Sequence, residues 1–369
     1  MNEREDAANK HGTAPRAWGI ALAVLLCLLI AFATGTWGRG AYEHSEVVMD
    51  TVVTLSADGN SGEKAVKESF IRMKEIEAAS SAALSDSDAA RVSAAAGNHE
   101  WISISHDLYY MLRFSNEWSK RTDGAWDVTM GPVTKLWGIG TDDERIPTAA
   151  EIAKVRERTG WRYLEIKEED GQFFARLMKP GMMLDLGGIA KGYALDEVRK
   201  IYERYGIKNG LINLGASTLY AYGHNAKGKP WRVGLKDPRA GGDAADGKLL
   251  GVISLSGGAL STSGDYERFF ERDGVRYHHI MDPKTGSPAR SGAMAVTIYV
   301  SDSVEDSGML SDILTTAAFV MGPEKGLSLM ESIDGVTGCI VSTDHTVYAV
   351  PGFDGRIEKL SDGYHMIRQ

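Results

Sequence analysis

The feature of this sequence that most constrains its fold is a stretch near the N-terminus without a charged side chain, from Ala17 to Trp37. Its length matches the roughly 20 apolar residues that an α-helix needs to cross a bilayer. Basic residues are more frequent before the stretch than after it: Arg4, Lys10 and Arg16 precede it, and Arg39 follows. This bias predicts a cytoplasmic N-terminus and export of the remaining chain.

The same stretch also has the form of a signal peptide, because residues 31–33 read Ala-Phe-Ala, the small-x-small pattern of a cleavage site. We favour the uncleaved anchor. The sequence therefore predicts two parts: residues 1–40, a cytoplasmic tail with a membrane anchor or signal segment, and residues 41–369, one exported domain. The protein is expected at the inner (cytoplasmic) membrane, with that domain facing the periplasm or the cell exterior.

Charge and cysteine content exclude several classes of protein. The net charge is −9 and no basic stripe with interleaved aromatic residues occurs, which argues against nucleic acid as a partner. The two cysteines, Cys27 and Cys339, lie far apart in the sequence, and no C-x-x-C or zinc-type spacing exists. Any bound metal would therefore be held mostly by oxygen, which favours a hard cation such as Mg²⁺.

After residue 41, apolar residues follow helical and strand-like spacings in turn, without a strict β-α-β order. Helices are predicted over residues 62–79, 106–121, 148–160 and 311–321, and residues 80–97 as a loop or frayed helix. Strands are predicted over residues 42–58, 210–223, 231–236 and 293–300, and strand pairs joined by a turn over residues 163–177, 266–280 and 338–350. This order predicts an α+β fold in which helices pack on a mainly antiparallel sheet.

Residues 185–192 form a glycine-rich motif, Asp-Leu-Gly-Gly-Ile-Ala-Lys-Gly, which the pattern places between a strand and a helix. Such a turn leaves main-chain N–H groups free at a helix N-terminus, an arrangement that suits a phosphate. The spacing fits neither a P-loop nor a dinucleotide-binding fingerprint. The alternative is a tight turn that binds nothing, with Asp185 as a cap.

A second motif, Ser-Asp-Ile-Leu-Thr-Thr, opens the helix predicted from Ser311. Asp312 and Thr316 are four residues apart and share one helix face. A carboxylate and a hydroxyl on one face can bind Mg²⁺ together with a main-chain carbonyl, while phosphate oxygens complete the coordination shell. Taken alone, Asp312 is more simply explained as a helix N-cap.

Two further motifs carry candidate chemistry. His278 and His279 end a predicted hairpin strand, and a histidine there could be a general acid or base or a phosphate ligand. Alternate strand residues face opposite sides of a sheet, so only one of the two is expected to face a cleft.

In residues 122–138, Trp126 and Trp137 lie beside glycine turns and could stack on a planar ring.

The set of motifs, in this order, resembles the ApbE family of FAD:protein FMN transferases over residues 45–350. The resemblance is carried by Val-Met-Asp-Thr (48–51), Gly-Ala-Trp-Asp-Val-Thr (124–129), the 185–192 motif, Ile-Asn-Leu-Gly (212–215), Ser-Thr-Ser-Gly-Asp-Tyr (261–266), His-Ile-Met-Asp-Pro-Lys-Thr-Gly (279–286) and Asp-Ile-Leu-Thr-Thr (312–316). It implies a T-fold-like, two-lobed α+β domain with FAD bound between the lobes.

The resemblance also implies roles for individual residues. The main-chain carbonyl of Gly188 and the side chains of Asp312 and Thr316 would bind Mg²⁺, and His279, not His278, would be the catalytic histidine. His278 is then expected to face solvent or the opposite lobe. The expected contacts with FAD are Met49, Ala125, Trp126, Asp127, Asp185, Lys191 and Ile280.

The implied reaction is Mg²⁺-dependent transfer of FMN from FAD to a Thr or Ser hydroxyl of an acceptor protein, with release of AMP. The expected acceptor is a separate, membrane-associated electron-transfer subunit.

The sequence departs from the family pattern at two positions. Ala83 stands where the family often has a tyrosine that covers the flavin or adenine region, and Asp50 stands where it usually has glycine. Loss of an aromatic cover could admit water, so an FAD pyrophosphatase that releases FMN and AMP is the alternative reaction. An exported flavin-binding protein without turnover is an alternative of another class. The joint presence of Asp312, Thr316 and His279 argues against it.

Overall fold

The computed structural model describes residues 41–240, 248–353 and 356–368. The predicted anchor or signal segment, in residues 1–40, lies outside this range. Within the described residues, no helix combines the length and the apolar character that crossing a bilayer requires.

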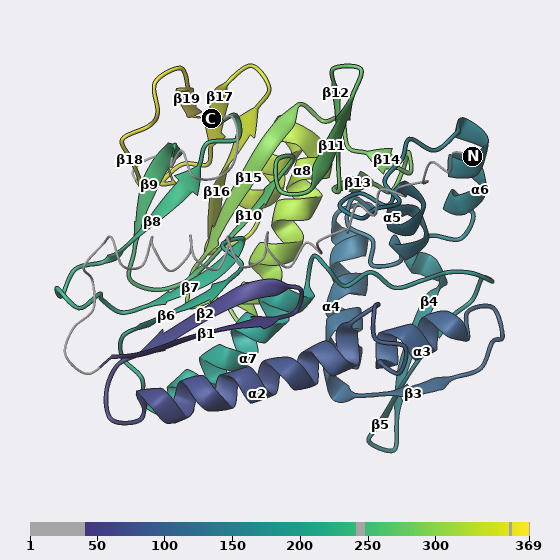
Figure 1. The fold of residues 1–369 in the computed structure, drawn as a ribbon, viewed down its shortest axis with the longest axis horizontal. Coiled ribbons are helices and arrows are strands. Elements are labelled where there is room, and N and C mark those ends of the chain that lie inside the picture. The colour runs from purple at the N-terminus through teal and green to yellow at the C-terminus, as the bar shows by residue number, and fades with distance from the viewer. Residues whose placement is uncertain (1–40, 241–247, 354–355, 369) are drawn as a thin grey trace, which may run out of the picture. The chain divides into compact units, whose positions relative to one another are not determined.

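The centre of the fold is a nine-stranded sheet in which every neighbouring pair is antiparallel except the pair at one edge (Figure 1). The predicted mainly antiparallel sheet is thus confirmed. In spatial order its strands are β1 (Tyr42–Val48), β2 (Thr51–Ala57), β6 (Gly210–Leu214), β7 (Thr218–Tyr222), β10 (Ala259–Gly264), β15 (Ala293–Val300), β16 (Val336–Ser342), β17 (Thr346–Ala349) and β19 (His365–Arg368).

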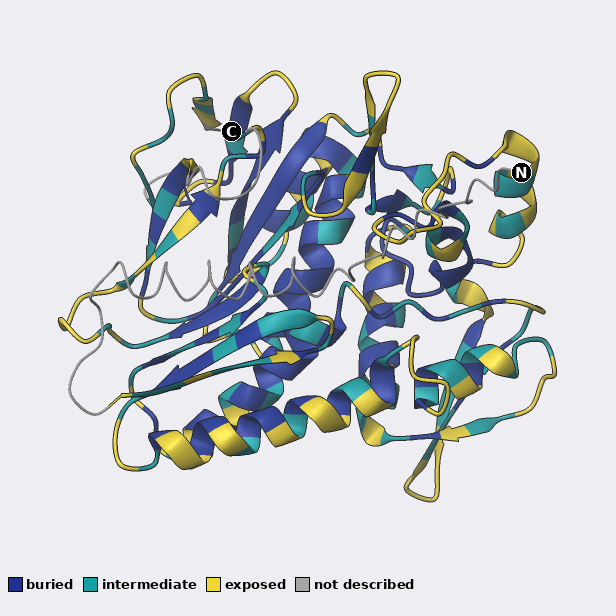
Figure 2. Ribbon diagram, in the orientation of Figure 1, coloured by how far each residue is buried: buried dark blue, intermediate teal, exposed yellow. Residues whose placement is uncertain are grey.

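Three long helices cover one face of this sheet: α2 (Gly62–Ser80), α7 (Ala190–Arg204) and α8 (Ser307–Glu331) (Figure 1). The other face packs against a small sheet of β8 (Trp231–Lys236), β9 (Leu249–Leu255) and β18 (Ile357–Glu358). Because both faces are covered, every residue of the interior strand β15 is buried (Figure 2). Alternate β15 side chains enter the two cores: Val296 faces the helices and Ala295 the small sheet.

The remaining elements form a second group beside the helices. It contains α3 (Asp88–Ala94), α4 (His106–Arg121), α5 (Gly131–Trp137), α6 (Ala149–Arg156), the 3₁₀ helix η1 (Trp161–Tyr163) and the sheet of β3 (Ile102–Ile104), β5 (Gln172–Leu177) and β4 (Leu164–Glu169). Two short hairpins follow later in the chain: β11 (Phe269–Arg272) with β12 (Val275–His278), and β13 (Met281–Asp282) with β14 (Ser287–Pro288).

Several predicted elements differ from the structure. Residues 42–57 form a hairpin instead of one strand, because Met49 and Asp50 both adopt positive φ angles, 54° and 56°, and reverse the chain. Residues 182–185 do not form the strand expected before the glycine turn, and Met183 makes only an isolated bridge to Met130. Residues 80–97 contain α3, whose Ala90 N–H bonds to the Ser87 hydroxyl.

Candidate functional site

The candidate site is built where the N-terminal turns of α7 and α8 cross. Gly192 and Gly308 meet there without side chains. A Cβ atom added to either glycine would lie 2.4 Å from the carbonyl oxygen of the other. Two glycines at one crossing allow the main chains to approach this closely. The contact places the first turns of both helices side by side.

Each helix carries a carboxylate that caps the other. Asp312 of α8 accepts a hydrogen bond from the Gly192 N–H in the first turn of α7, at 3.0 Å. Asp196 of α7 accepts from the Gly308 and Met309 N–H groups in the first turn of α8, at 2.8 and 2.9 Å. The reading of Asp312 as the cap of its own helix is wrong, because α8 begins at Ser307 and runs through Asp312.

The predicted metal ligands lie close together beside this crossing. A Cβ atom added to Gly188 would lie 3.4 Å from the Thr316 hydroxyl oxygen and 2.8 Å from the Trp126 ring. The Thr316 hydroxyl has no hydrogen bond to any residue that the structure describes. Asp312 and Thr316 belong to successive turns of α8. A free hydroxyl, a carboxylate and a glycine main chain are therefore adjacent.

Asp312 is buried, and burial raises the pKa of its carboxyl group. The positive charge of Lys191, the Gly192 N–H and the Thr218 hydroxyl act in the opposite direction, toward the ionised form. The Thr218 hydroxyl lies 3.0 Å from Asp312 Oδ1, and Lys191 Nζ donates to the Ser217 hydroxyl at 2.5 Å. The site thus contains a buried carboxylate that a cation would stabilise.

Asp185 shapes the glycine turn. Its Oδ1 accepts from the Gly187 N–H at 3.0 Å, and its Oδ2 accepts from the Thr134 hydroxyl of α5 at 2.9 Å. The alternative that Asp185 caps the helix is wrong, because α7 begins at Ala190 with Ile189 at its N-cap position, and the bond to Gly187 lies in the turn before the helix. Asp185 is partly exposed, so it can also contact a ligand.

Predicted FAD contacts occur in the turn of residues 125–127, where all three residues are buried. The Asp127 carboxylate bonds to the N–H and hydroxyl of Thr129, at 2.8 and 2.6 Å, and to the Trp161 N–H at 3.0 Å. Its side chain therefore stabilises the turn itself. Trp126 packs its ring against Gly188, and its indole Nε1 is buried without a partner among the described residues.

Two other predicted FAD contacts lie on separate segments. The Met49 N–H donates to Glu77 Oε1 of α2 at 2.9 Å, which fixes the β1–β2 turn. Ile280 is buried, and its carbonyl accepts from the Ala289 N–H at 2.9 Å. Neither contact brings these side chains into the group formed by Gly188, Asp312 and Thr316.

The two histidines differ in surroundings. His278 is buried against Phe319 of α8, with Nε2 3.0 Å from the Ala289 carbonyl oxygen. Of the two surroundings expected for it, solvent or the opposite lobe, solvent is therefore excluded. His279 follows the last residue of β12, is half-buried and places Nδ1 3.3 Å from the Arg268 carbonyl oxygen. Burial lowers the pKa of His279 to about 3, and the nearby charge of Arg268 acts in the same direction. The ring is therefore neutral at pH 7.

The oxygen set fits a hard cation. No group of three or more His, Cys, Asp or Glu side chains gathers as a metal site among the described residues. The candidate ligands are instead one carboxylate, one hydroxyl and one main-chain carbonyl. Mg²⁺ is commonly bound by one or two carboxylates, while water and phosphate oxygens fill the remaining positions.

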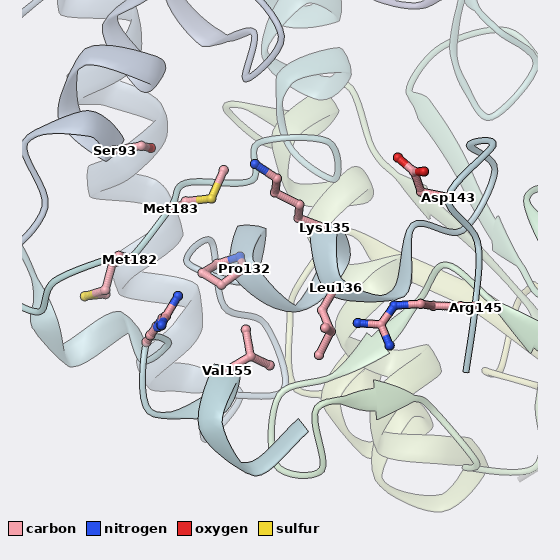
Figure 3. Close-up of a pocket in the computed structure, with 11 residues that line it drawn as sticks. Ser93, Pro132, Lys135, Leu136, Asp143, Arg145, Val155, Met182 and Met183 are labelled. Carbon is pink, nitrogen blue, oxygen red and sulfur yellow. The ribbon is translucent and has the colours of Figure 1, made fainter. Parts of the chain in front are cut away.

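A cavity of about 560 Å³ lies in the second group of elements, away from the crossing of α7 and α8 (Figure 3). Its lining includes Lys135 of α5, Val155 of α6, and Met182 and Met183 of the segment before Asp185. None of the predicted site residues lines it. The cavity is therefore separate from the group formed by Gly188, Asp312 and Thr316.

Three residues of the site were not predicted from the sequence. Ser217 contacts Lys191, and Thr218 contacts Asp312. Asp196 contacts the first turn of α8. A weak signal existed for the first two, because only Ala216 separates them from the 212–215 motif. Asp196 gave no signal, since a carboxylate in the middle of a helix usually faces solvent.

The fold and site together define an α+β protein in which the N-termini of two helices converge beside a group of candidate oxygen ligands. The family model of the ApbE family matches residues 49–341. A relative named FAD:protein FMN transferase from Treponema pallidum is 31% identical over 358 residues, which cover 92% of this chain and 95% of the relative. A relative of the same name from Klebsiella pneumoniae is 31% identical over 326 residues, 88% of this chain and 97% of the relative.

Solved structures agree with these relatives. The ApbE protein of Thermotoga maritima has a TM-score of 0.74 and 30% identity, over 86% of this chain and all of that chain. The flavin transferase ApbE of Vibrio cholerae has a TM-score of 0.74 and 27% identity, over 86% of this chain and 99% of that chain. The chain belongs to the ApbE family.

Proposed function

We propose that this protein is an FAD:protein FMN transferase that needs Mg²⁺ and attaches FMN to a Thr or Ser hydroxyl of an acceptor protein. The observation that carries the proposal is the grouping of Asp312, Thr316 and Gly188 at the crossing of α7 and α8, in a chain whose relatives carry that name. The reaction breaks the pyrophosphate bond of FAD, forms a phosphoester with the acceptor oxygen and releases AMP.

Mg²⁺ would be held by the Asp312 carboxylate, the Thr316 hydroxyl and the Gly188 carbonyl. When bound, the cation would neutralise charge on the phosphates. Lys191 adds a positive charge near Asp312. The first turns of α7 and α8 add the positive ends of two helix dipoles. These groups would orient the pyrophosphate for attack, which is the main requirement of phosphoryl transfer.

His279 would accept the proton of the acceptor hydroxyl. Its ring is neutral at pH 7, so it can bind a proton. A pKa of about 3 makes a weak base, but a pyrophosphate bound nearby would favour the imidazolium ion and raise this pKa. His278 is not suited to the role, because its Nε2 bonds to a main-chain carbonyl inside the core.

FAD pyrophosphatase activity is the second candidate. Ala83 lies exposed in the segment between α2 and α3, where it offers no aromatic cover for a bound ring. Water could then replace the acceptor hydroxyl and give FMN and AMP.

The proposal also covers where in the cell the protein acts. Residues 1–40 would anchor the chain in the inner membrane, and the catalytic domain would face the periplasm or cell exterior, where it would meet a membrane-associated electron-transfer subunit. The charge bias around the Ala17–Trp37 stretch supports this orientation. Protease added to spheroplasts should digest the domain, and protection of the whole chain would contradict the orientation.

The function is tested by incubating the protein with FAD, Mg²⁺ and a candidate acceptor. In-gel flavin fluorescence reports transfer, and AMP release reports pyrophosphate cleavage. Asp312→Ala removes the only charged metal ligand, so AMP release should fall at least ~100-fold. AMP without a fluorescent acceptor would indicate the pyrophosphatase. Full activity in EDTA, or in Asp312→Ala, would exclude the metal site.

A further inference from the structure

The Asp312 carboxylate accepts one donor on each oxygen from two different parts of the fold. The Gly192 N–H of α7 bonds to Oδ2 and the Thr218 hydroxyl of β7 bonds to Oδ1, both at 3.0 Å. One donor on each oxygen fixes the rotation of the carboxylate about its Cβ–Cγ bond. Each oxygen keeps lone-pair capacity for a further partner.

Thr218 is itself firmly placed. It is the first residue of β7, it is fully buried, and it pairs with Leu214 of β6 and Ser261 of β10. A buried β-branched side chain in a strand has little rotamer freedom. The hydroxyl therefore has a fixed position from which to donate to Asp312.

The turn before Thr218 is held by a close contact between Gly215 and Thr51. Gly215 has a φ angle of 67°, and a Cβ atom there would lie 2.0 Å from the Thr51 hydroxyl oxygen, so the residue must be glycine. Ser217, the last residue of the turn, bonds to Lys191, and Thr218, the first residue of β7, bonds to Asp312. The glycine that ends the 212–215 motif is thus required by the turn that precedes Thr218.

We infer that Thr218 is a positioning residue for the metal ligand Asp312, and that its hydroxyl sets the affinity of the site for a divalent cation. The inference rests on the proposed function, because it takes Asp312 as a ligand. Partners that orient a metal ligand typically change metal affinity about 10- to 100-fold when they are removed.

Thr218→Val keeps the shape of the side chain and removes only the hydroxyl, while Thr218→Ser keeps the hydroxyl. Binding of Mn²⁺ to the whole protein, followed by electron paramagnetic resonance, should weaken about 10- to 100-fold in Thr218→Val and less than about 3-fold in Thr218→Ser. Thr297→Val is the matched control, because it removes another buried sheet hydroxyl that bonds to Thr262 on a neighbouring strand. It should bind Mn²⁺ like the wild type.

A merely structural role of Thr218 would lower the melting temperature and leave Mn²⁺ affinity unchanged, which would overturn the inference. If Thr218→Val does not fold, Thr218→Ala replaces it with the same expected loss. Asp312→Ala distinguishes failure of this inference from failure of the proposed metal site. Loss of Mn²⁺ binding in Asp312→Ala but not in Thr218→Val would overturn the inference alone. Normal binding in both would overturn the metal site of the proposed function as well.

Discussion

Gly192 and Gly308 contact each other through main-chain atoms, and this contact sets how closely α7 and α8 approach. A Cβ atom on either residue would fall 2.4 Å from the carbonyl oxygen of the other. Four residues from each glycine along its helix, Asp196 and Asp312 cap the partner helix. The distance between the helices therefore determines whether Asp312 can reach the Gly192 N–H.

We predict that Gly308→Ala destabilises the protein by about 1–3 kcal/mol, as overpacking typically does, and raises the Mg²⁺ concentration needed for half-maximal AMP release several-fold. The added methyl group must separate the helices and draw Asp312 away from α7. Chemical denaturation and Mg²⁺ titration of the FAD reaction measure the two effects. Gly326→Ala is the control, since it crowds α8 against Ile340 and not against α7. An unchanged Mg²⁺ requirement in Gly308→Ala would show that the distance between α7 and α8 does not control the position of Asp312.

The sequence was sufficient to predict elements whose apolar periodicity is regular. Helix α4 and strand β15 occur at the predicted residues, 106–121 and 293–300. It was not sufficient at residues 42–57, because the chain reverses there through positive φ angles at Met49 and Asp50, which non-glycine residues seldom adopt. No strand was predicted where β10 lies, since Ser261 and Ser263 bond to hydroxyls of α8 instead of contributing an apolar face.

In the candidate site too, the sequence predicted some features and missed others. The spacing of Asp312 and Thr316 on one helix face follows from helical periodicity, so the sequence predicted it. The contacts of Asp312 with Gly192 and Thr218 join residues about 120 and 94 positions apart. Such contacts depend on how helices and strands pack against one another, and this packing cannot be predicted from a local sequence pattern.

We predict that His279→Ala abolishes FMN transfer while FAD still binds, because the residue would serve the chemical step more than the bound ground state. Flavin fluorescence quenching measures binding, and the fluorescent acceptor band measures transfer. His278→Ala should retain FMN transfer per folded molecule but unfold more easily, since it leaves a cavity beside Phe319. Activity in His279→Ala, with loss of activity in folded His278→Ala, would reverse the assignment.

His278 should also make stability depend on pH. Burial lowers its pKa from 6.5 to about 4 in the folded protein. Between these values the unfolded chain binds more protons than the folded one, so stability is highest above pH 6.5 and falls as the pH falls toward 4. The loss attributable to this residue is roughly 3 kcal/mol.

His278→Gln removes the titrating ring, so we predict that the difference in unfolding free energy between wild type and variant changes between pH 7 and pH 4 in favour of the variant. Urea denaturation at a series of pH values measures it. Asp196 acts in the opposite direction, since burial raises its pKa to about 7, but it is present in both proteins and cancels in the difference. A difference that does not vary with pH would show that His278 is not protonated on unfolding.

The last prediction concerns the absent aromatic cover. Ala83 is exposed, and its N–H bonds to the Ser81 hydroxyl at 3.2 Å in the segment that joins α2 to α3. Ala83→Tyr would supply a ring at the position where the family often has one. A stacked ring typically contributes about 1–3 kcal/mol, so FAD should bind at least ~5-fold more tightly. The ratio of FMN transfer to AMP released without transfer should rise, because the ring would exclude water from the phosphate. Ala82→Tyr is the matched control, since it adds the same ring at the preceding exposed residue. Fluorescence titration with FAD and the paired assay of AMP and flavinylated acceptor measure both quantities. If the two variants behave alike, the effect comes from added apolar surface and not from a cover over the flavin or adenine ring.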